Sequence, residues 1–137
     1  TALPKMVANT TSPNLASAIK EHIEVTKLQV ARLDEVFGLL GEKAQGKKCE
    51  AMAGLIKEGD SILEETAPGP VRDAGIIAAS QKIEHYEIAT YGTLVVFAQN
   101  MGHNDAAELL QFTLDNEKAT DVAAERPDEI EPAENGK

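Results

Sequence analysis

The stretch GEKAQGKKCEAMAGLIKEGDSILEETAPGP, residues 41–70, separates two long helical patterns and decides how the chain folds. It begins with a glycine, a residue that often ends helices, and it finishes with the strong breaker Pro68-Gly69-Pro70. Its middle, residues 50–65, has the apolar spacing of one short amphipathic helix. Bundles in which each helix reverses the direction of the previous one need only short loops, so this long connection predicts a crossover.

The two long helical patterns flank this crossover. The first begins at Ser12 and Pro13, where the serine can cap the helix and the proline fits the first helical position. Its apolar positions recur every three, four or seven residues: Leu15, Ile19, Ile23, Val30, Leu33, Phe37 and Leu40. The second pattern covers residues 71–101 and matches the first in length. A crossover that lets these two helices run parallel is the ferritin-like arrangement.

The remaining segments complete a helical bundle. Residues 1–8 are typical of the end of a helix, and residues 104–124 predict a last helix after a Gly-His-Asn stop. Residues 126–137 contain two prolines and four acids and predict a disordered acidic tail. We therefore predict an all-α, ferritin-like four-helix bundle over residues 1–125, with a truncated first helix and one long crossover that contains a short helix.

Composition narrows the class of protein. A hydrophobic fraction of 42% excludes wholesale disorder, and few β-branched runs favour helices. The net charge of −10 disfavours nucleic acid and anionic membranes as partners, because both need a basic surface. No apolar run approaches the roughly 20 residues of a membrane span. The single cysteine excludes an internal disulfide framework and suits a reducing cytoplasm.

Several ionisable side chains fall on the predicted inner faces when each helix is rotated by about 100° per residue. The inward polar residues are His22 and Thr26 on the first long helix, Gln81, Glu84, Glu87 and Tyr91 on the second, and Glu117 and Asp121 on the last. Carboxylates are rarely buried unless they are paired or bound to metal. Several carboxylates and an imidazole that face one bundle interior are typical of a carboxylate-bridged two-metal site.

A satisfied polar network is the alternative to a metal site. In that network Glu84 and Glu87 would bond Lys82, Gln81 or Tyr91. Glu117 would pair with Lys118 or Lys82, and His22 would be an ordinary core histidine. We interpret Asp121, near the end of the last helix, as solvated, and His85 and His103 as structural residues.

The two-metal template is only partly matched. It places Glu-x-x-His on two of the helices, and no histidine here follows a glutamate by three positions. The nearest variant is Glu84-x-x-Glu87. The template also takes an acid from the first helix, and residues 1–8 contain none. The sequence therefore predicts an incomplete site.

Five motifs carry a family resemblance. They are LPKM (3–6), LLGEK (39–43), GKKCEAM (46–52), QKIEHYEIATYG (81–92) and TLDNEKATD (113–121). Together they resemble the ferritin-like stress-response family of the bacterial YciE and YciF proteins, over residues 1–121. The resemblance implies a rubrerythrin-like four-helix bundle, a bacterial cytoplasmic protein associated with stress, a homodimer and a di-iron-type centre.

Two functions follow for such a chain. In the first, the bundle binds two metal ions, with iron first and manganese or zinc as substitutes, and carries out oxygen or peroxide redox chemistry. The metal ligands would be Glu84, Glu87, Glu117 and His22, and Tyr91 and Gln81 would hydrogen-bond to those ligands. In the second, the chain is a metal-free helical homodimer that acts as a structural or protein-interaction stress protein. The sequence does not decide whether there is catalytic turnover.

Overall fold

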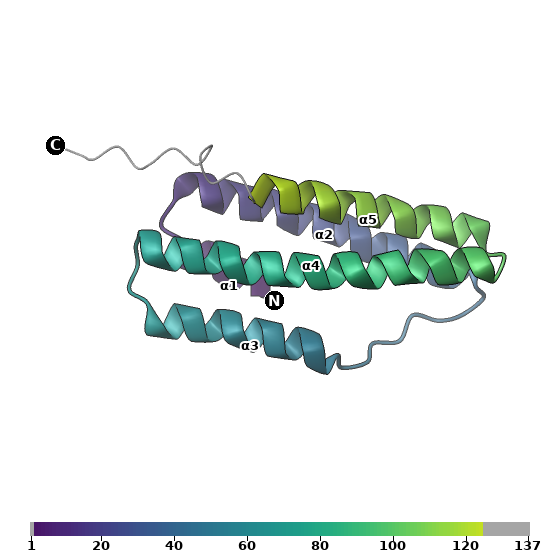
Figure 1. The fold of residues 1–137 in the computed structure, drawn as a ribbon, viewed down its shortest axis with the longest axis horizontal. Helices are drawn as coiled ribbons and strands as arrows, with labels where there is room; N and C mark the ends of the chain where they lie inside the picture. The colour runs from purple at the N-terminus through teal and green to yellow at the C-terminus, as the bar shows by residue number, and fades with distance from the viewer. Residues whose placement is uncertain (1, 125–137) are drawn as a thin grey trace.

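The computed structural model describes residues 2–124 as a bundle of five α-helices, with side chains described for residues 2–121 (Figure 1). The helices are α1 (Ala2–Asn9), α2 (Pro13–Leu39), α3 (Glu50–Glu65), α4 (Pro70–Asn100) and α5 (Asn104–Ala124). No strand occurs over this range, so the all-α prediction is confirmed. The predicted acidic tail, residues 126–137, lies outside the described residues. None of the described helices is both long enough and apolar enough to cross a membrane.

The helix boundaries follow from local chemistry. The Ser12 side chain caps α2 by accepting a hydrogen bond from the backbone N–H of Leu15 at 3.2 Å, and Pro13 occupies the first turn. Gly41 and Gly102 follow the ends of α2 and α4 with φ of 71° and 77°. This left-handed conformation favours glycine and ends a helix.

One carboxylate ties the start of α2 to α4. Asp73, in the first turn of α4, accepts four hydrogen bonds of 2.7–3.0 Å from the turn between α1 and α2. The donors are the hydroxyls of Thr10 and Thr11 and the backbone N–H groups of Thr11 and Ser12. These bonds lower the pKa of Asp73 even though partial burial acts to raise it.

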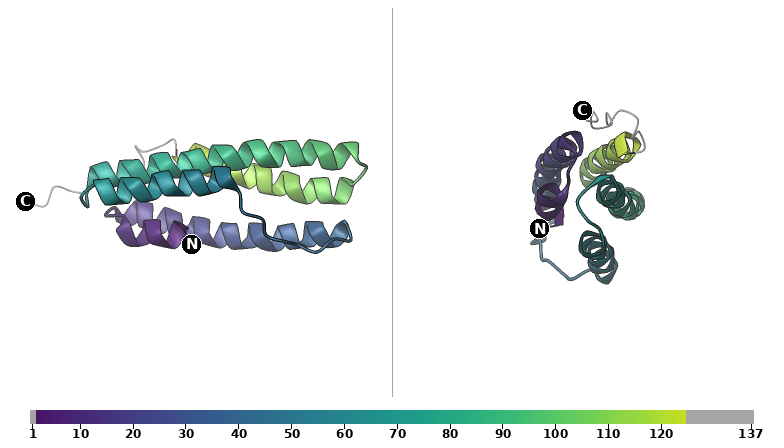
Figure 2. Two further views of the ribbon diagram at one scale, coloured as in Figure 1. Left: turned by 90° about the horizontal axis from the view of Figure 1, so that it is seen from below. Right: turned by 90° about the vertical axis from the view of Figure 1, so that its left-hand side faces the viewer.

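The crossover sets the topology. The colour gradient shows that α2 and α4 run in the same direction, while residues 41–49 and α3 carry the chain back between them (Figure 1). Helix α3 packs against α4, α1 lies along α2, and α4 has its most extensive contact with α5 (Figure 2). The ferritin-like bundle with one long crossover is therefore confirmed.

Gly75 allows α3 to approach α4 closely. A Cβ at Gly75 would lie 2.5 Å from Cγ2 of Ile62, which is closer than two carbon atoms pack. Gly59 is buried, and a Cβ there would lie 3.5 Å from Met6 and 3.6 Å from Ala79. Helix α3 can therefore pack directly against the first part of α4, where Gly75 lies.

Two apolar cores occupy the ends of the bundle. The first core consists of Met6, Leu15, Ile19, Leu63, Ile76 and Ala79. The second core consists of Val36, Val95, Ala98, Ala106, Ala107, Leu110 and Leu114. The stretch of α2, α4 and α5 between them is the polar middle section, which we define as His22, Gln29, Glu84, Glu87, Thr113 and Glu117. The fold thus encloses polar groups between two hydrophobic ends.

The predicted apolar stripe on α2 is wrong in its second half. Val30 is 56% exposed and Leu40 is 40% exposed, whereas Gln29 and Val36 are buried. The line that faces the bundle is Leu15, Ile19, His22, Thr26, Gln29, Leu33 and Val36, with alternating steps of four and three. The centre of this line is polar. A prediction based on apolar residues therefore selects Val30 and Phe37, each one position after the buried Gln29 and Val36.

Candidate metal centre

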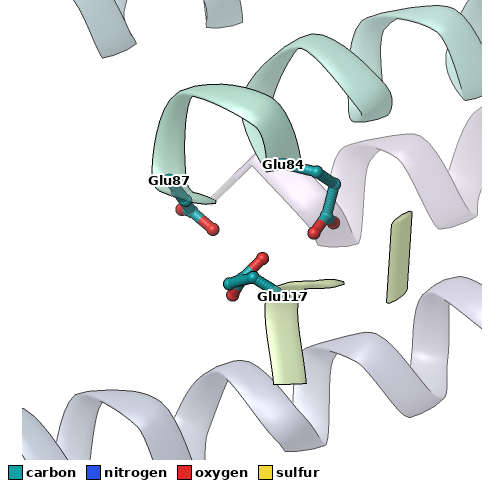
Figure 3. Close-up of side chains that lie close together, drawn as sticks. All are labelled: Glu84, Glu87 and Glu117. Carbon is teal, nitrogen blue, oxygen red and sulfur yellow. The ribbon is translucent and has the colours of Figure 1, made fainter. Parts of the chain in front are cut away.

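Three glutamates from two helices meet in the polar middle section. Glu84 and Glu87 lie one turn apart on α4, and Glu117 approaches them from α5 (Figure 3). One carboxylate oxygen from each lies within 4.8 Å of the others. Glu84 is 3% exposed and Glu117 is 0% exposed. This separation is short enough for one or more cations to contact all three side chains.

The buried carboxylates have little compensation from the protein. Both oxygens of Glu117 and Oε2 of Glu84 are buried without a hydrogen-bond partner. No lysine or arginine among the described residues forms an ion pair with the cluster, and Lys82 instead contacts the exposed Glu58 at 3.2 Å. The predicted pairing of Glu117 with Lys82 or Lys118 is therefore wrong in this structure. A buried carboxylate without a partner is unfavourable, so the cluster requires protons or cations.

The pKa values of Glu84 and Glu87 also indicate that the cluster requires protons or cations. Burial, followed by the neighbouring Glu117 and Glu87 carboxylates, raises the pKa of Glu84 to about 10. Burial and the charge of Glu117 raise the pKa of Glu87 to about 8. At neutral pH the metal-free cluster therefore holds protons where cations would otherwise sit. A bound cation would favour the ionised carboxylates and displace those protons.

The structure places His22 beside Glu84. Its Nε2 lies 3.2 Å from Oε1 of Glu84, and its Nδ1 is buried without a partner. Burial lowers the pKa of His22 more than the charge of Glu117 raises it, so the imidazole is neutral at pH 7. A neutral imidazole is the form that binds metals. His22 is nevertheless not one of the three side chains whose ligand atoms lie within 4.8 Å of one another.

Tyr91 and Gln81 lie on the same helix as the α4 glutamates, and both are half-buried. Burial, followed by the charges of Glu87 and Glu117, raises the pKa of Tyr91 to about 12. Neither side chain donates a hydrogen bond to a cluster carboxylate within the described part of the chain. Their roles as hydrogen-bonding partners of metal ligands stay predictions.

The edge of the cluster contains a fourth carboxylate. Asp121 was expected to be solvated, but its side chain is only 15% exposed, and its Oδ1 lies 2.7 Å from Nε2 of His85. The α5 helix places Asp121 one turn after Glu117, and its charge also raises the pKa of Glu84. That interpretation was wrong because the end of α5 still packs against α4 at this position. His103 is exposed in the turn before α5.

Three residues of this region were missed from the sequence. Gln29 is 5% exposed with Nε2 unpartnered, and continuing the alternating steps from Leu15 through His22 would have found it. Thr113 is 1% exposed and accepts a 2.7 Å hydrogen bond from the Arg32 guanidinium. That guanidinium also lies 4.3 Å from the centre of the Phe112 ring. No sequence signal joins Arg32 to Thr113.

Comparisons with known proteins agree with this architecture. Residues 1–126 match the family described as Domain of unknown function (DUF892). Protein YciF of Escherichia coli strain K12 is 46% identical over 122 residues, which cover 88% of this chain and 74% of that relative.

Two solved structures resemble the fold closely. YcfI from Rhodopseudomonas palustris, for which a structural role has been suggested, aligns with a TM-score of 0.88 and 44% identity over 90% of this chain and 79% of that one. The E. coli stress protein YciF aligns with a TM-score of 0.87 and 44% identity over 94% of this chain and 80% of that one.

Proposed function

This chain belongs to the YciE/YciF stress-protein family, whose domain carries the description DUF892, and from that premise we propose that its bundle binds a carboxylate-rich di-metal centre. The observation that supports this most is the convergence of Glu84, Glu87 and Glu117, none of which forms an ion pair with a lysine or arginine among the described residues. The family resemblance predicted from the motifs is confirmed. The metal centre is our proposal for what the fold does.

The residues fit a metal in their chemistry as well as their position. The three carboxylates supply oxygen ligands, and His22 supplies a nitrogen next to Glu84. Oxygen with one imidazole suits iron first, then manganese or zinc. Bound iron would supply redox chemistry toward dioxygen or peroxide.

The protein's own groups would do three things at this centre. The carboxylates release protons as the cation enters, and the imidazole stays neutral because it is partly buried. The two apolar cores hold α2, α4 and α5 so that the ligands stay oriented. Tyr91 would place a neutral hydroxyl beside the cluster, because its pKa is raised to about 12.

A metal-free structural protein is the second candidate. Protons on Glu84 and Glu87 would remove two of the three carboxylate charges at pH 7 without any cation, which would let the bundle fold without metal. The structural role suggested for YcfI points the same way. In both candidates we place the protein in the cytoplasm as a homodimer, with no nucleic acid or membrane partner.

Metal content in matched variants tests the proposal. Chelator-treated protein is dialysed anaerobically against Fe(II), and against Mn(II) and Zn(II) separately, and the metal per chain is measured by elemental analysis. We expect one to two ions per chain in the wild type, retention in Glu108→Gln on the exposed side of α5, and loss in Glu117→Gln. Absence of metal from the wild type would favour the metal-free candidate, and equal metal content in Glu117→Gln and wild type would place the ions outside this cluster.

A further inference from the structure

A second pair of metal-ligating side chains lies outside the carboxylate cluster. His85 directly follows Glu84 on α4, and Asp121 lies about one helical turn after Glu117 on α5. Nε2 of His85 approaches Oδ1 of Asp121 to 2.7 Å, so the pair joins the two helices that carry the cluster. The side chain of His85 is 61% exposed and that of Asp121 is 15% exposed. This outer pair, His85 and Asp121, therefore extends from solvent toward the buried glutamates.

The geometry of the outer pair differs from that of a hydrogen bond. Oδ1 of Asp121 is buried without a hydrogen-bond partner although Nε2 of His85 is 2.7 Å away, so the ring N–H is not directed at it. Two ligands of one cation have this relation, because their lone pairs converge on the ion and their ligand atoms lie about 3 Å apart. An imidazole nitrogen beside a carboxylate oxygen suits Zn(II), Mn(II) or Fe(II).

The outer pair can be reached from solvent, whereas the cluster is closed. Glu84 is 3% exposed and Glu117 is 0% exposed, so a hydrated cation does not meet them at the surface. Exposed side chains change rotamer within picoseconds to nanoseconds, so His85 can turn aside and uncover Oδ1 of Asp121. A divalent cation holds its water strongly, and ligands that replace part of its hydration shell on the way in lower the cost of entry.

We propose that His85 and Asp121 form an outer binding site for a divalent transition-metal cation, through which the cation reaches Glu84 and Glu117. His85 binds the cation from solvent, and Asp121, one turn from Glu117, passes it inward as carboxylate oxygens replace its remaining water. The inference rests on the proposed metal centre as the destination of the cation. The alternative is the structural role expected of His85 from the sequence, in which the pair only holds α4 against α5.

The three histidines of the chain allow the outer site to be tested without the buried centre. Chelator-treated Glu117→Gln is titrated at pH 7 with Mn(II), whose unpaired electrons broaden the NMR signals of nearby imidazoles. His22 lies beside the cluster, and His103 is exposed in the turn before α5. We expect His85 to broaden at about tenfold lower Mn(II) than the other two, because Asp121 supplies a second ligand.

The difference between the histidines should disappear when Asp121→Asn is added to Glu117→Gln. Equal broadening of His85 and His103 in Glu117→Gln would overturn the outer site. Earlier broadening of His22 would overturn it too, because the ion would then bind in the remaining part of the cluster.

The rate of metal uptake tests delivery to the cluster. Chelator-treated full-length wild type and His85→Gln are mixed with Zn(II) in a stopped-flow instrument, and the loss of free Zn(II) is followed with a zinc-responsive dye. Glutamine still donates a hydrogen bond to Asp121 but is a poor ligand for Zn(II). We expect about tenfold slower uptake in His85→Gln, with the same final zinc content and melting temperature, and no change in His103→Gln. Uptake at the wild-type rate in folded His85→Gln would overturn the delivery role.

The buried centre and the outer site fail in different measurements. Failure of the buried centre would appear as an absence of Zn(II) uptake by the wild type. Failure of the outer site would appear as equal broadening of His85 and His103 in Glu117→Gln. A lower melting temperature in His85→Gln with an unchanged uptake rate would assign His85 the structural role instead.

Discussion

The two apolar cores and the polar middle section lie along the same α2 and α4 helices, but they have opposite energetics. Burial of the core side chains stabilises the bundle, at about 25 cal/mol per Å² of apolar surface. Burial of Glu84 and Glu117 without partners costs stability. The bundle tolerates this section because a hydrophobic core lies on either side of it. The two ends therefore supply the stability of the fold, and under our proposal the middle section supplies the metal ligands.

Removing apolar volume from the first core should have the largest effect. Ile76 is 2% exposed, and Ile76→Ala should lower the free energy of unfolding by about 2–5 kcal/mol through lost burial and a new cavity. Val71→Ala, on the same helix but at a side chain that is 74% exposed, should change it by less than about 0.5 kcal/mol. Urea denaturation measures both. Similar losses in the two variants would contradict the claim that burial of Ile76 in the first core stabilises the bundle.

Removing a carboxylate from the middle section should act in the opposite direction. Glu117→Leu eliminates a fully buried carboxylate that forms no ion pair, so the metal-free protein should gain about 1–3 kcal/mol of stability. The same variant should lose any rise in melting temperature that added metal gives the wild type. Glu108→Leu, at an exposed site on α5, is the control. A clear loss of stability in metal-free Glu117→Leu would mean that Glu117 is a structural hydrogen-bonding residue.

Stability should also depend on pH through Glu84. Its pKa is raised from an ordinary value of 4.5 to about 10, so the folded state holds a proton that the unfolded state has released. The corresponding stability is fully present below pH 4.5 and is lost as the pH rises toward 10, at about 1.4 kcal/mol per pH unit. Denaturation of the metal-free protein between pH 5 and pH 8 measures this slope. Glu84→Gln should remove about half of it, because Glu87, whose pKa is raised to about 8, contributes a similar share over this range. An unchanged slope in that variant would assign the proton to another group.

The smallest effect should come from Val30, which the apolar pattern of α2 placed inside the bundle. Val30 is 56% exposed, so Val30→Lys should change the unfolding free energy by no more than about 0.5 kcal/mol. The neighbouring Gln29 is 5% exposed, and Gln29→Lys would bury a charge and destabilise the protein more. Thermal melts of the two variants compare the faces directly. A larger loss of stability in Val30→Lys than in Gln29→Lys would mean that Val30 faces the bundle, as the apolar pattern predicted.

The helices could be predicted from the sequence because their signals are local. Caps such as Ser12-Pro13, stops such as Gly41 and Gly102, and apolar periodicity fix where each helix begins and ends. The length of residues 41–70 then determined that α2 and α4 run parallel. These signals depend on neighbouring residues only, so no knowledge of packing was needed.

The three glutamates of the candidate site could be predicted from the sequence, but the contacts between side chains on different helices could not. Glu84, Glu87 and Glu117 are buried or half-buried at positions that helical rotation places inward. The contacts of Asp121 with His85 and of Arg32 with Thr113 depend on how the helices lie against each other. Gln29 was missed because the prediction of the buried face of α2 followed apolar residues only, and Gln29 is a polar residue on that face.

Proton release during metal titration tests the central claim most directly. Zn(II) or Mn(II) is titrated into the chelator-treated protein at pH 7 in buffers of different ionisation enthalpy, and calorimetry gives both the stoichiometry and the protons released. The account predicts one to two ions per chain, with protons leaving as the cation replaces those on Glu84 and Glu87. Absence of binding, or binding without proton release that persists in Glu117→Gln, would contradict it.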